Sequence, residues 1–337
     1  MKAIVYKEYG PPDVLHLEDI AKPAPKENEV LVRIHASSVG YGDILARKFK
    51  DVSPSEFNMP FPLWFISKFY FGLNEPKVKI LGSEISGMIE AAGKDVTRFK
   101  AGDPVFGYLG QSMGGYAEYI CLPENAVLAA KPANMTYEEA AVIPMGAIMA
   151  LHLLWEKGNI QPGHKVLING ASGGIGSAAV QIAKSYGAEV TGVCGTARLE
   201  FVKSLGADKV IDYTKQDFTR SGETYDLIFD VLGRSSFPDT KSSLKENGRC
   251  LYASFKSRQL LQMLSTSISG SKKVICALAP GGLEDLLSAK ELIEAGKIKS
   301  IIDKSFPLEQ TAQAHRYVED GHKKGHIVIS VVAEEHT

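Results

Sequence analysis

Residues 165–187 join a short apolar run, a loop of small residues and an amphipathic segment, and they constrain the fold more than any other stretch of the chain. In the loop GASGGIG, Ala171, Gly173 and Gly176 have the spacing of a G-x-G-x-x-G motif with alanine in the first place. Because the loop lies between a predicted strand and a predicted helix, it is typical of a dinucleotide site, in which helix amides face the diphosphate. An ordinary strand-to-helix turn is the alternative.

The sequence after this loop favours the dinucleotide site over an ordinary turn. Apolar strand patterns alternate with segments that can form helices or short connections. The predicted strands cover residues 165–169, 189–194, 209–212, 226–232, 249–255 and 272–279. Six strands in this arrangement predict an α/β domain with a doubly wound parallel sheet.

The rest of the chain has a different pattern. Residues 1–122 contain short strands separated by turn residues, which predicts an antiparallel, barrel-like domain. A helical stretch with Thr136 as a plausible N-cap follows, so we place the second domain at residues 123–280. Residues 281–337 show a helix, strand, helix, strand pattern that could return to the first domain.

Composition excludes several functional classes. The 337 residues include 38 basic and 39 acidic side chains without a block of one sign, so we expect no nucleic-acid partner. Four widely spaced cysteines and an N-terminus without a signal-peptide pattern predict a cytoplasmic protein without disulfides. The apolar segment 59–73 is too short to span a membrane. It is either an insertion packed on the core or a lid over an apolar substrate.

The residues after the second predicted strand indicate which dinucleotide binds. NAD-binding proteins place an acidic residue there, which accepts a hydrogen bond from the ribose 2′-hydroxyl. Residues 194–198 contain no acid, and Thr196 and Arg198 can donate hydrogen bonds to a 2′-phosphate. NADPH is therefore the predicted cofactor. NAD is the alternative if Arg198 is simply solvated and Glu200 weakens its field.

Five segments have the content and order of a known superfamily. They are MKAIVYKEYGPPDVLHLED, LGSEISGMIEAAGKDVTRFKAGDPVFG, GGYAEYICLPENAVLAAKP, INGASGGIGSAAVQIAKSYGAEV with SLGADKVIDY, and GHIVISV. Through them nearly the whole chain resembles the medium-chain dehydrogenase/reductases, and within these the zinc-free quinone oxidoreductase branch that includes zeta-crystallin. The resemblance implies a GroES-like β-rich catalytic domain made from both chain ends, a Rossmann domain between them, and a homodimer joined through the edge strand 272–279.

The resemblance also implies a set of cofactor-binding residues. Family members that use NADPH hold its 2′-phosphate with a basic residue and a tyrosine that align with Arg198 and Tyr213. The complete predicted set is Ser172, Gly173, Gly174, Ile175, Gly176, Gly195, Thr196, Arg198, Tyr213, Val231 and Ser254.

Zinc-dependent members of the superfamily bind catalytic zinc through a cysteine, a histidine and a third ligand. The segments that should bring the first two are SSVGYGD and, at residues 82–84, GSE, and both ligands are missing. We therefore predict no metal site, and we interpret Glu84 as a buried hydrogen-bonding carboxylate. His322 and His326 are four residues apart, but Gly325 lies between them and a strand pattern follows, so we predict that both are surface residues.

Without a metal to polarise a carbonyl, hydride addition to a conjugated acceptor is a reaction that needs less help than alcohol oxidation. We therefore predict an NADPH-dependent reductase of quinones, enals or enones, in which Tyr41 donates to the developing oxygen charge. A packed loop tyrosine is the alternative. Many relatives carry asparagine where this chain has Gly40, and a threonine near the nicotinamide where it has Met149. These departures motivate a rival, a non-catalytic NADPH-binding scaffold or sensor, and a zinc alcohol dehydrogenase is a third hypothesis.

Overall fold

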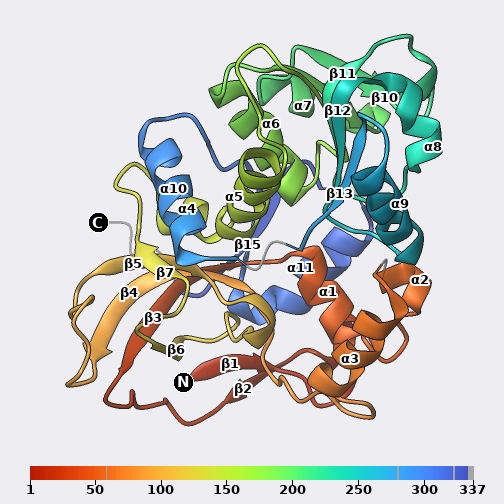
Figure 1. The fold of residues 1–337 in the computed structure, drawn as a ribbon. Coiled ribbons are helices and arrows are strands. Elements are labelled where there is room, and N and C mark those ends of the chain that lie inside the picture. The colour runs from red at the N-terminus through yellow and green to blue at the C-terminus, as the bar shows by residue number, and fades with distance from the viewer. Residues whose placement is uncertain (58, 279–280, 322, 333–337) are drawn as a thin grey trace.

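The computed structural model describes residues 1–57, 59–278, 281–321 and 323–332, which form two large sheets surrounded by helices (Figure 1). One sheet has six strands and the other has seven. A separate antiparallel pair, β1 (Lys2–Val5) and β2 (His16–Asp19), completes the strands near the N-terminus.

The six-stranded sheet is parallel throughout, with the strand order β10-β9-β8-β11-β12-β13. Its strands are β8 (Lys165–Asn169), β9 (Glu189–Cys194), β10 (Lys209–Asp212), β11 (Tyr225–Asp230), β12 (Leu244–Tyr252) and β13 (Lys273–Cys276). The connecting helices are α6 (Gly174–Ser185), α7 (Leu199–Ser204), α8 (Phe237–Thr240) and α9 (Ser257–Ile268). The predicted doubly wound sheet is confirmed, and its switch point lies between β8 and β11.

Helices cover both faces of this sheet, which explains why its strands are apolar almost without alternation. Val166 and Ile168 of β8 face a core shared with Ala179 of α6, whereas Leu167 faces a second core shared with Phe255. Helix α6 gives way to Gly187, whose φ of +78° suits a residue without a side chain. The amphipathic helix predicted after the glycine loop is therefore confirmed.

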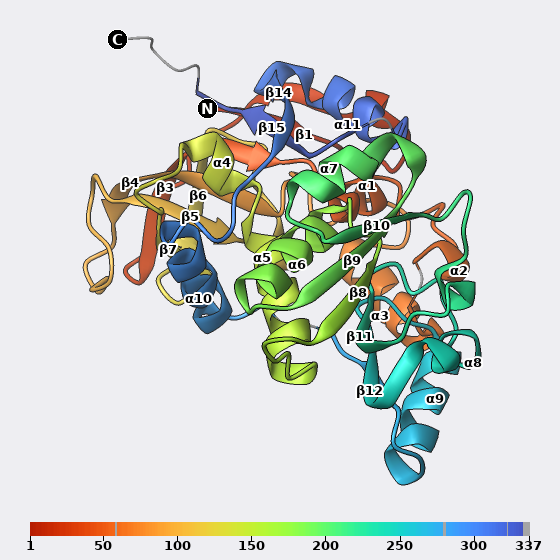
Figure 2. The same cartoon turned by 90° about the horizontal axis from the view of Figure 1, so that it is seen from above.

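The seven-stranded sheet has the order β14-β15-β3-β4-β5-β7, and β6 also pairs with β3. Its strands are β3 (Glu29–Ser38), β4 (Glu84–Ala92), β5 (Pro104–Tyr108), β6 (Tyr119–Pro123), β7 (Leu128–Ala130), β14 (Ile302–Pro307) and β15 (His326–Ser330). Antiparallel pairing places Val328 of β15 opposite Ser38 of β3, so the two ends of the chain build one sheet, as predicted (Figure 2). Strand β7 belongs to this sheet although it lies beyond residue 122, the predicted end of the first part of the domain. The exact domain limits stay a prediction.

The remaining helices are α1 (Tyr41–Arg47), α2 (Pro54–Phe57), α3 (Phe61–Phe71), α4 (Tyr137–Ala141), α5 (Pro144–Leu151), α10 (Leu283–Glu294) and α11 (Thr311–Glu319). The helical stretch predicted after residue 134 is divided, because Pro144 cannot continue the hydrogen bonds of α4 and begins α5 instead. Thr136 caps α4 as predicted, since its hydroxyl accepts a hydrogen bond from the backbone of Glu139 at 3.1 Å.

Helix α3 contains most of the apolar segment 59–73. Phe71 is buried and the indole N–H of Trp64 donates to the carbonyl of Val52 at 3.0 Å, so one side of the helix packs on the protein. Phe61 and Ile66 are 59% and 61% exposed on the other side. Among the described residues, none of this segment lines the cleft discussed below, which argues against the lid. Every helix in the described part of the chain is too short or too polar to cross a bilayer.

Candidate active site

A cleft of about 920 Å³ lies at the switch point of the parallel sheet. The first wall of the cleft consists of the glycine loop and the ends of β11 and β12, and its residues include Gly173, Gly174, Ile175, Val231 and Ser254. The facing wall comes from the other sheet and its flanking segments, and its residues include Ser38, Tyr41, Glu84, Lys323 and His326. The cleft therefore gathers side chains from both ends and the middle of the chain.

The glycine loop has the close packing that a dinucleotide site requires. A Cβ atom on Gly176 would lie 2.1 Å from the carbonyl oxygen of Gly170, so this position excludes every side chain unless the backbone moves. The nearest atom to a Cβ on Gly173 would be 3.5 Å away, which leaves space on the cleft side. Helix α6 begins at Gly174, and its first backbone N–H groups have no partner within the helix. These residues fit a diphosphate.

The loop after β11 is held by a buried carboxylate that sequence reasoning missed. Asp230, the last residue of β11, is fully buried and accepts backbone hydrogen bonds from Leu232, Gly233 and Ser235 at 3.1, 3.0 and 2.7 Å. It also accepts from the Asn169 side chain at the end of β8, at 3.1 Å. Asp230 therefore fixes the loop that carries Val231 and its neighbours along the cleft. An aspartate at the end of a predicted strand was the available signal.

Four predicted cofactor residues lie together at the ends of the neighbouring strands β9 and β10, outside the described lining of the cleft. A Cβ on Gly195 would lie 3.6 Å from the hydroxyl of Tyr213, whose side chain is 62% exposed. The hydroxyl of Thr196 donates to Asp212 at 2.5 Å, and this bond helps to lower the pKa of the Asp212 carboxyl. Arg198 donates from Nε to the carbonyl of Lys323 at 3.1 Å and also donates to the carbonyl of Gly321. The structure thus adds one acidic group, Asp212, that the sequence argument did not weigh.

Glu84, the first residue of β4, is the buried carboxyl group of the facing wall, with 3% exposure. Its Oε2 accepts a hydrogen bond from the Ser38 hydroxyl at 2.5 Å, and its Oε1 accepts one from the Met145 backbone at 2.8 Å. Burial raises the pKa of Glu84 to about 7 and the charge of Asp43 adds to the shift, whereas both hydrogen bonds and Lys323 oppose it. The interpretation of Glu84 as a buried hydrogen-bonding group is confirmed.

The prediction that His326 is a surface residue is wrong. A Cβ on Gly174 would lie 3.7 Å from the His326 ring, so the ring faces the glycine loop across the cleft. Burial, followed by the charge of Lys323, lowers the pKa of His326 to about 4. Burial also lowers the pKa of Lys323, with the charge of Arg198 in second place. Both side chains reach the cleft because β15 pairs with β3, which the local pattern did not reveal. His322 lies outside the described residues.

Tyr41, the predicted catalytic residue, is the first residue of α1 and lines the cleft with 59% exposure. This placement favours a side chain available to a ligand over a packed loop tyrosine. Gly40 also lines the cleft. Met149 is absent from the described lining, and Met145, one helical turn earlier, lines the cleft in its place. The threonine expected near the nicotinamide was therefore compared with Met149, whereas the turn of α5 that lines the cleft carries Met145.

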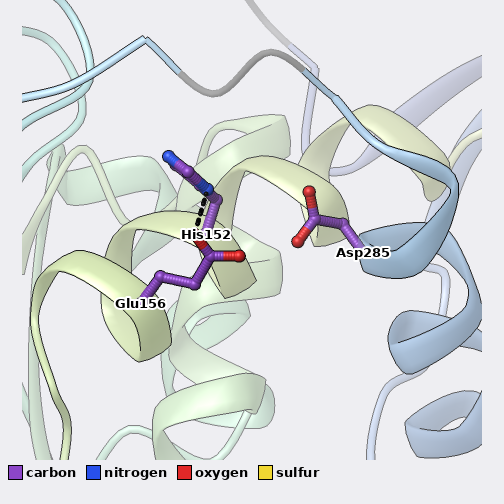
Figure 3. A group of neighbouring side chains, drawn as sticks. All are labelled: His152, Glu156 and Asp285. Carbon is purple, nitrogen blue, oxygen red and sulfur yellow. Dashed lines mark ion pairs between the residues drawn. The ribbon is translucent and has the colours of Figure 1, made fainter.

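The donor atoms at the usual zinc position do not fit that metal. The segments expected to bring the ligands, residues 37–43 and 82–84, contain no cysteine or histidine, and from them Ser38, Val39, Gly40, Tyr41 and Glu84 line the cleft. A separate group of His152, Glu156 and Asp285 lies away from the cleft, with ligand atoms within 4.8 Å of one another (Figure 3). There the Nδ1 atom of His152 lies 3.0 Å from a carboxyl oxygen of Glu156, and Asp285 accepts a hydrogen bond from the backbone of Gly282 at 3.3 Å. Each of these side chains therefore has a protein partner, and Asp285 serves as part of the cap of α10.

Comparison with known families agrees with the two-sheet architecture. Residues 26–132 match the family described as the alcohol dehydrogenase GroES-like domain. Residues 205–329 match the family described as zinc-binding dehydrogenase.

Individual relatives match almost the whole chain. The mitochondrial NAD(P)H oxidoreductase RTN4IP1 of Mus musculus is 31% identical over 98% of this chain and 89% of its own length. The 2-methylene-furan-3-one reductase of Solanum lycopersicum is 30% identical over 98% of this chain and 79% of its own length. The structure of the quinone oxidoreductase from Coxiella burnetii superimposes with a TM-score of 0.83 at 28% identity, covering 98% of this chain and 99% of the other.

Proposed function

Since the chain belongs to the medium-chain dehydrogenase/reductase superfamily, we propose that it is an oxidoreductase that uses NADPH to reduce quinones or α,β-unsaturated carbonyl compounds without a metal ion. The cleft carries the proposal. One wall fits a dinucleotide, and the facing wall offers hydroxyl, carboxyl, ammonium and imidazole groups instead of the thiolate and imidazole set of a catalytic zinc site. The names of the tomato and Coxiella relatives support the two substrate classes.

NADPH supplies a hydride when it is bound, and the residues of this chain divide its binding between them. The glycine loop would hold the diphosphate, with Lys323 and His326 facing it from the other wall. Gly195, Thr196, Arg198 and Tyr213 would surround the adenosine end. The guanidinium of Arg198 favours a 2′-phosphate, and Asp212 weakens that preference. NAD(P)H in the name of the mouse relative supports a nicotinamide cofactor of either kind.

The facing wall provides what a conjugated acceptor needs. Tyr41 can donate a hydrogen bond to the oxygen on which negative charge develops, because its side chain lines the cleft and is accessible. The apolar lining residues Val39, Leu45, Val142 and Ile175 exclude water from the same space. Such a site suits a small apolar quinone, enal or enone.

Stopped-flow measurement of NADPH oxidation with a panel of quinones, enals and enones tests this function. We expect turnover with at least one class, in protein from which zinc has been removed by a chelator. Tight NADPH binding without turnover would favour a scaffold or sensor, which the cleft residues on the facing wall argue against. Activity that requires one zinc ion per chain would favour an alcohol dehydrogenase.

We also propose that the protein is a homodimer and that it is located in the cytoplasm. Strand β13 is an edge of the parallel sheet, and a second copy seated on this side would form a homodimer. Helix α9 already covers part of this edge, because the backbone N–H groups of Val274 and Cys276 donate to the side chains of Thr266 and Met263. All four cysteines are free in the structure, which fits a reducing compartment such as the cytoplasm. Sedimentation velocity of the purified protein tests the dimer.

A further inference from the structure

Ser38 and Glu84 form a hydrogen-bonded pair that both lines the cleft and is almost closed to solvent. Ser38 and Glu84 are each 3% exposed, and the Ser38 hydroxyl lies 2.5 Å from the carboxyl of Glu84. The other carboxyl oxygen accepts from the Met145 backbone. A hydroxyl both donates and accepts, so when Glu84 is neutral its O–H can donate to Ser38, and the proton of Ser38 is then free to face the cleft.

We propose that Ser38 and Glu84 form the proton relay that protonates the α-carbon of an enone in this cleft; this inference rests on the proposed function. The β-carbon of the enone gains a C–H bond from the reduced nicotinamide, and the alkene electrons become an enolate. The enolate α-carbon then takes the proton of the Ser38 hydroxyl, while Glu84 gives its proton to Ser38. Glu84 is left as a carboxylate that regains a proton from water. The enone is reduced by two electrons, and the nicotinamide is oxidised by two.

The charged groups around Glu84 suit this role. The charge of Asp43 disfavours the carboxylate form of Glu84. Burial raises the pKa of Asp43 itself to about 6. Lys323 favours the carboxylate and so stabilises the form left after transfer. Burial keeps Tyr108 and Tyr116 protonated by raising their pKa, to about 12 for Tyr108. His326 stays neutral because its pKa is about 4, so it does not compete as an acid near neutral pH.

The relay predicts a difference between the two substrate classes. The enolate is a base that needs a proton delivered to its α-carbon, and a positioned acid contributes roughly 100-fold or more to such a step. A reduced quinone takes its protons on oxygen, where water can supply them. Enone reduction should therefore depend on Glu84 far more than quinone reduction does.

The test uses Ser38→Ala and Glu84→Gln. Glutamine keeps the shape, accepts from the Met145 backbone through its oxygen and donates to the Ser38 hydroxyl through its NH₂ group. The matched control is Ser37→Ala on the same strand, whose hydroxyl donates to the backbone carbonyl of Glu84 at 2.7 Å and lies outside the relay. We expect Glu84→Gln and Ser38→Ala to reduce an α-methyl enone about 100-fold more slowly and to lose the single configuration at its α-carbon. Quinone reduction should change little, and Ser37→Ala should retain both the rate and the configuration.

A second readout does not depend on turnover. Infrared titration of the cofactor-free protein should show a neutral carboxylic acid band that disappears with a midpoint near pH 7 in the wild type and in Ser37→Ala, and that is missing in Glu84→Gln. If the wild-type protein reduces neither quinones nor enones, the proposed function is contradicted, whereas the infrared titration still reports the protonation of Glu84. If the wild type is active and the Glu84→Gln variant still reduces the enone stereospecifically, the relay is overturned. The relay is also overturned if the carboxylic acid band of Glu84 is absent at pH 6.

Discussion

The glycine loop lines the cleft with three consecutive residues, 173–175, whereas the facing wall brings together residues 38–41, Glu84, and Lys323 with His326. The first wall owes its form to local sterics, because Gly176 must approach the carbonyl of Gly170 closely. The second wall exists because β15 pairs with β3 and β3 pairs with β4. The glycine loop is therefore encoded locally, whereas the facing wall depends on strands that meet from distant parts of the chain.

The largest effect should come from breaking the local wall. We expect Gly176→Ala to weaken NADPH binding by about 100-fold or more, because the added Cβ would lie 2.1 Å from the Gly170 oxygen and must displace the loop. Fluorescence titration with NADPH measures the loss, and circular dichroism shows whether the fold persists. Gly42→Ala is the control, since a Cβ there meets nothing within 4 Å. Normal binding by Gly176→Ala would show that the loop is not the diphosphate site.

A smaller effect is expected on the facing wall. Lys323→Ala should raise the Kd for NADPH by about tenfold, equivalent to ~1.4 kcal/mol, because it removes a positive charge that faces the diphosphate. The wild-type Kd should increase with salt more steeply than the Kd of the variant. Lys324→Ala, next in sequence and exposed, is the control. Equal losses in the two variants would mean that general charge, and not position, matters.

Arg198 connects the two walls and should affect cofactor choice more than affinity for the diphosphate. Arg198→Ala should lower the preference for NADPH over NADH several-fold, because a charged donor near the 2′-phosphate is lost. Steady-state kcat/KM values with both cofactors measure the change. Asp212→Asn should shift the preference the other way, because it removes a negative charge beside Thr196. An unchanged ratio in both variants would place the 2′-phosphate elsewhere.

A further prediction concerns stability where the chain ends meet. His315 of α11 is fully buried between Arg47 and Tyr116, with ring nitrogens 3.0 and 3.2 Å from their polar atoms. Burial, followed by the charge of Arg47, lowers its pKa from 6.5 to about 3. The unfolded chain therefore binds a proton between pH 6.5 and 3 that the folded chain does not, and the free energy of unfolding falls as the pH falls through this window.

His315→Gln should remove that contribution. Its free energy of unfolding should fall less steeply below pH 6.5 than that of the wild type, by at most ~1.4 kcal/mol per pH unit. Urea unfolding at pH 7, 6 and 5 measures the slopes. Glu84 and Asp43, whose pKa values are raised, act in the opposite sense in both proteins and cancel in the comparison. Parallel slopes would contradict the assignment.

Sequence reasoning reached most of the fold because the relevant signals were local. The predicted strands 165–169, 189–194 and 209–212 coincide with β8, β9 and β10, since apolar runs between turn residues need no tertiary information. The parallel sheet and the return of the C-terminal strands followed from their order. The split between α4 and α5 was missed, although Pro144 signalled it.

The site was predicted less completely, for a physical reason. Gly173, Gly174 and Ile175, which line the cleft, were assigned to the cofactor because a dinucleotide-binding loop imposes a spacing on consecutive residues. Lys323 and His326 were not assigned, because a lysine and a histidine before a strand are ordinary in sequence and gain their meaning from sheet pairing. The prediction of NADPH also did not take Asp212 into account, whose carboxyl group accepts a hydrogen bond from Thr196 across to the neighbouring strand.

The pairing of β15 with the last residues of β3 has a consequence for a protein that ribosomes make from its N-terminus. Residues 36–38 of β3 leave the exit tunnel long before residues 328–330, their partners in β15, have been synthesised. During that interval every strand of the parallel sheet is already available to fold. Nascent molecules therefore acquire the parallel sheet first, and the facing wall of the cleft becomes complete only after β15 has been synthesised.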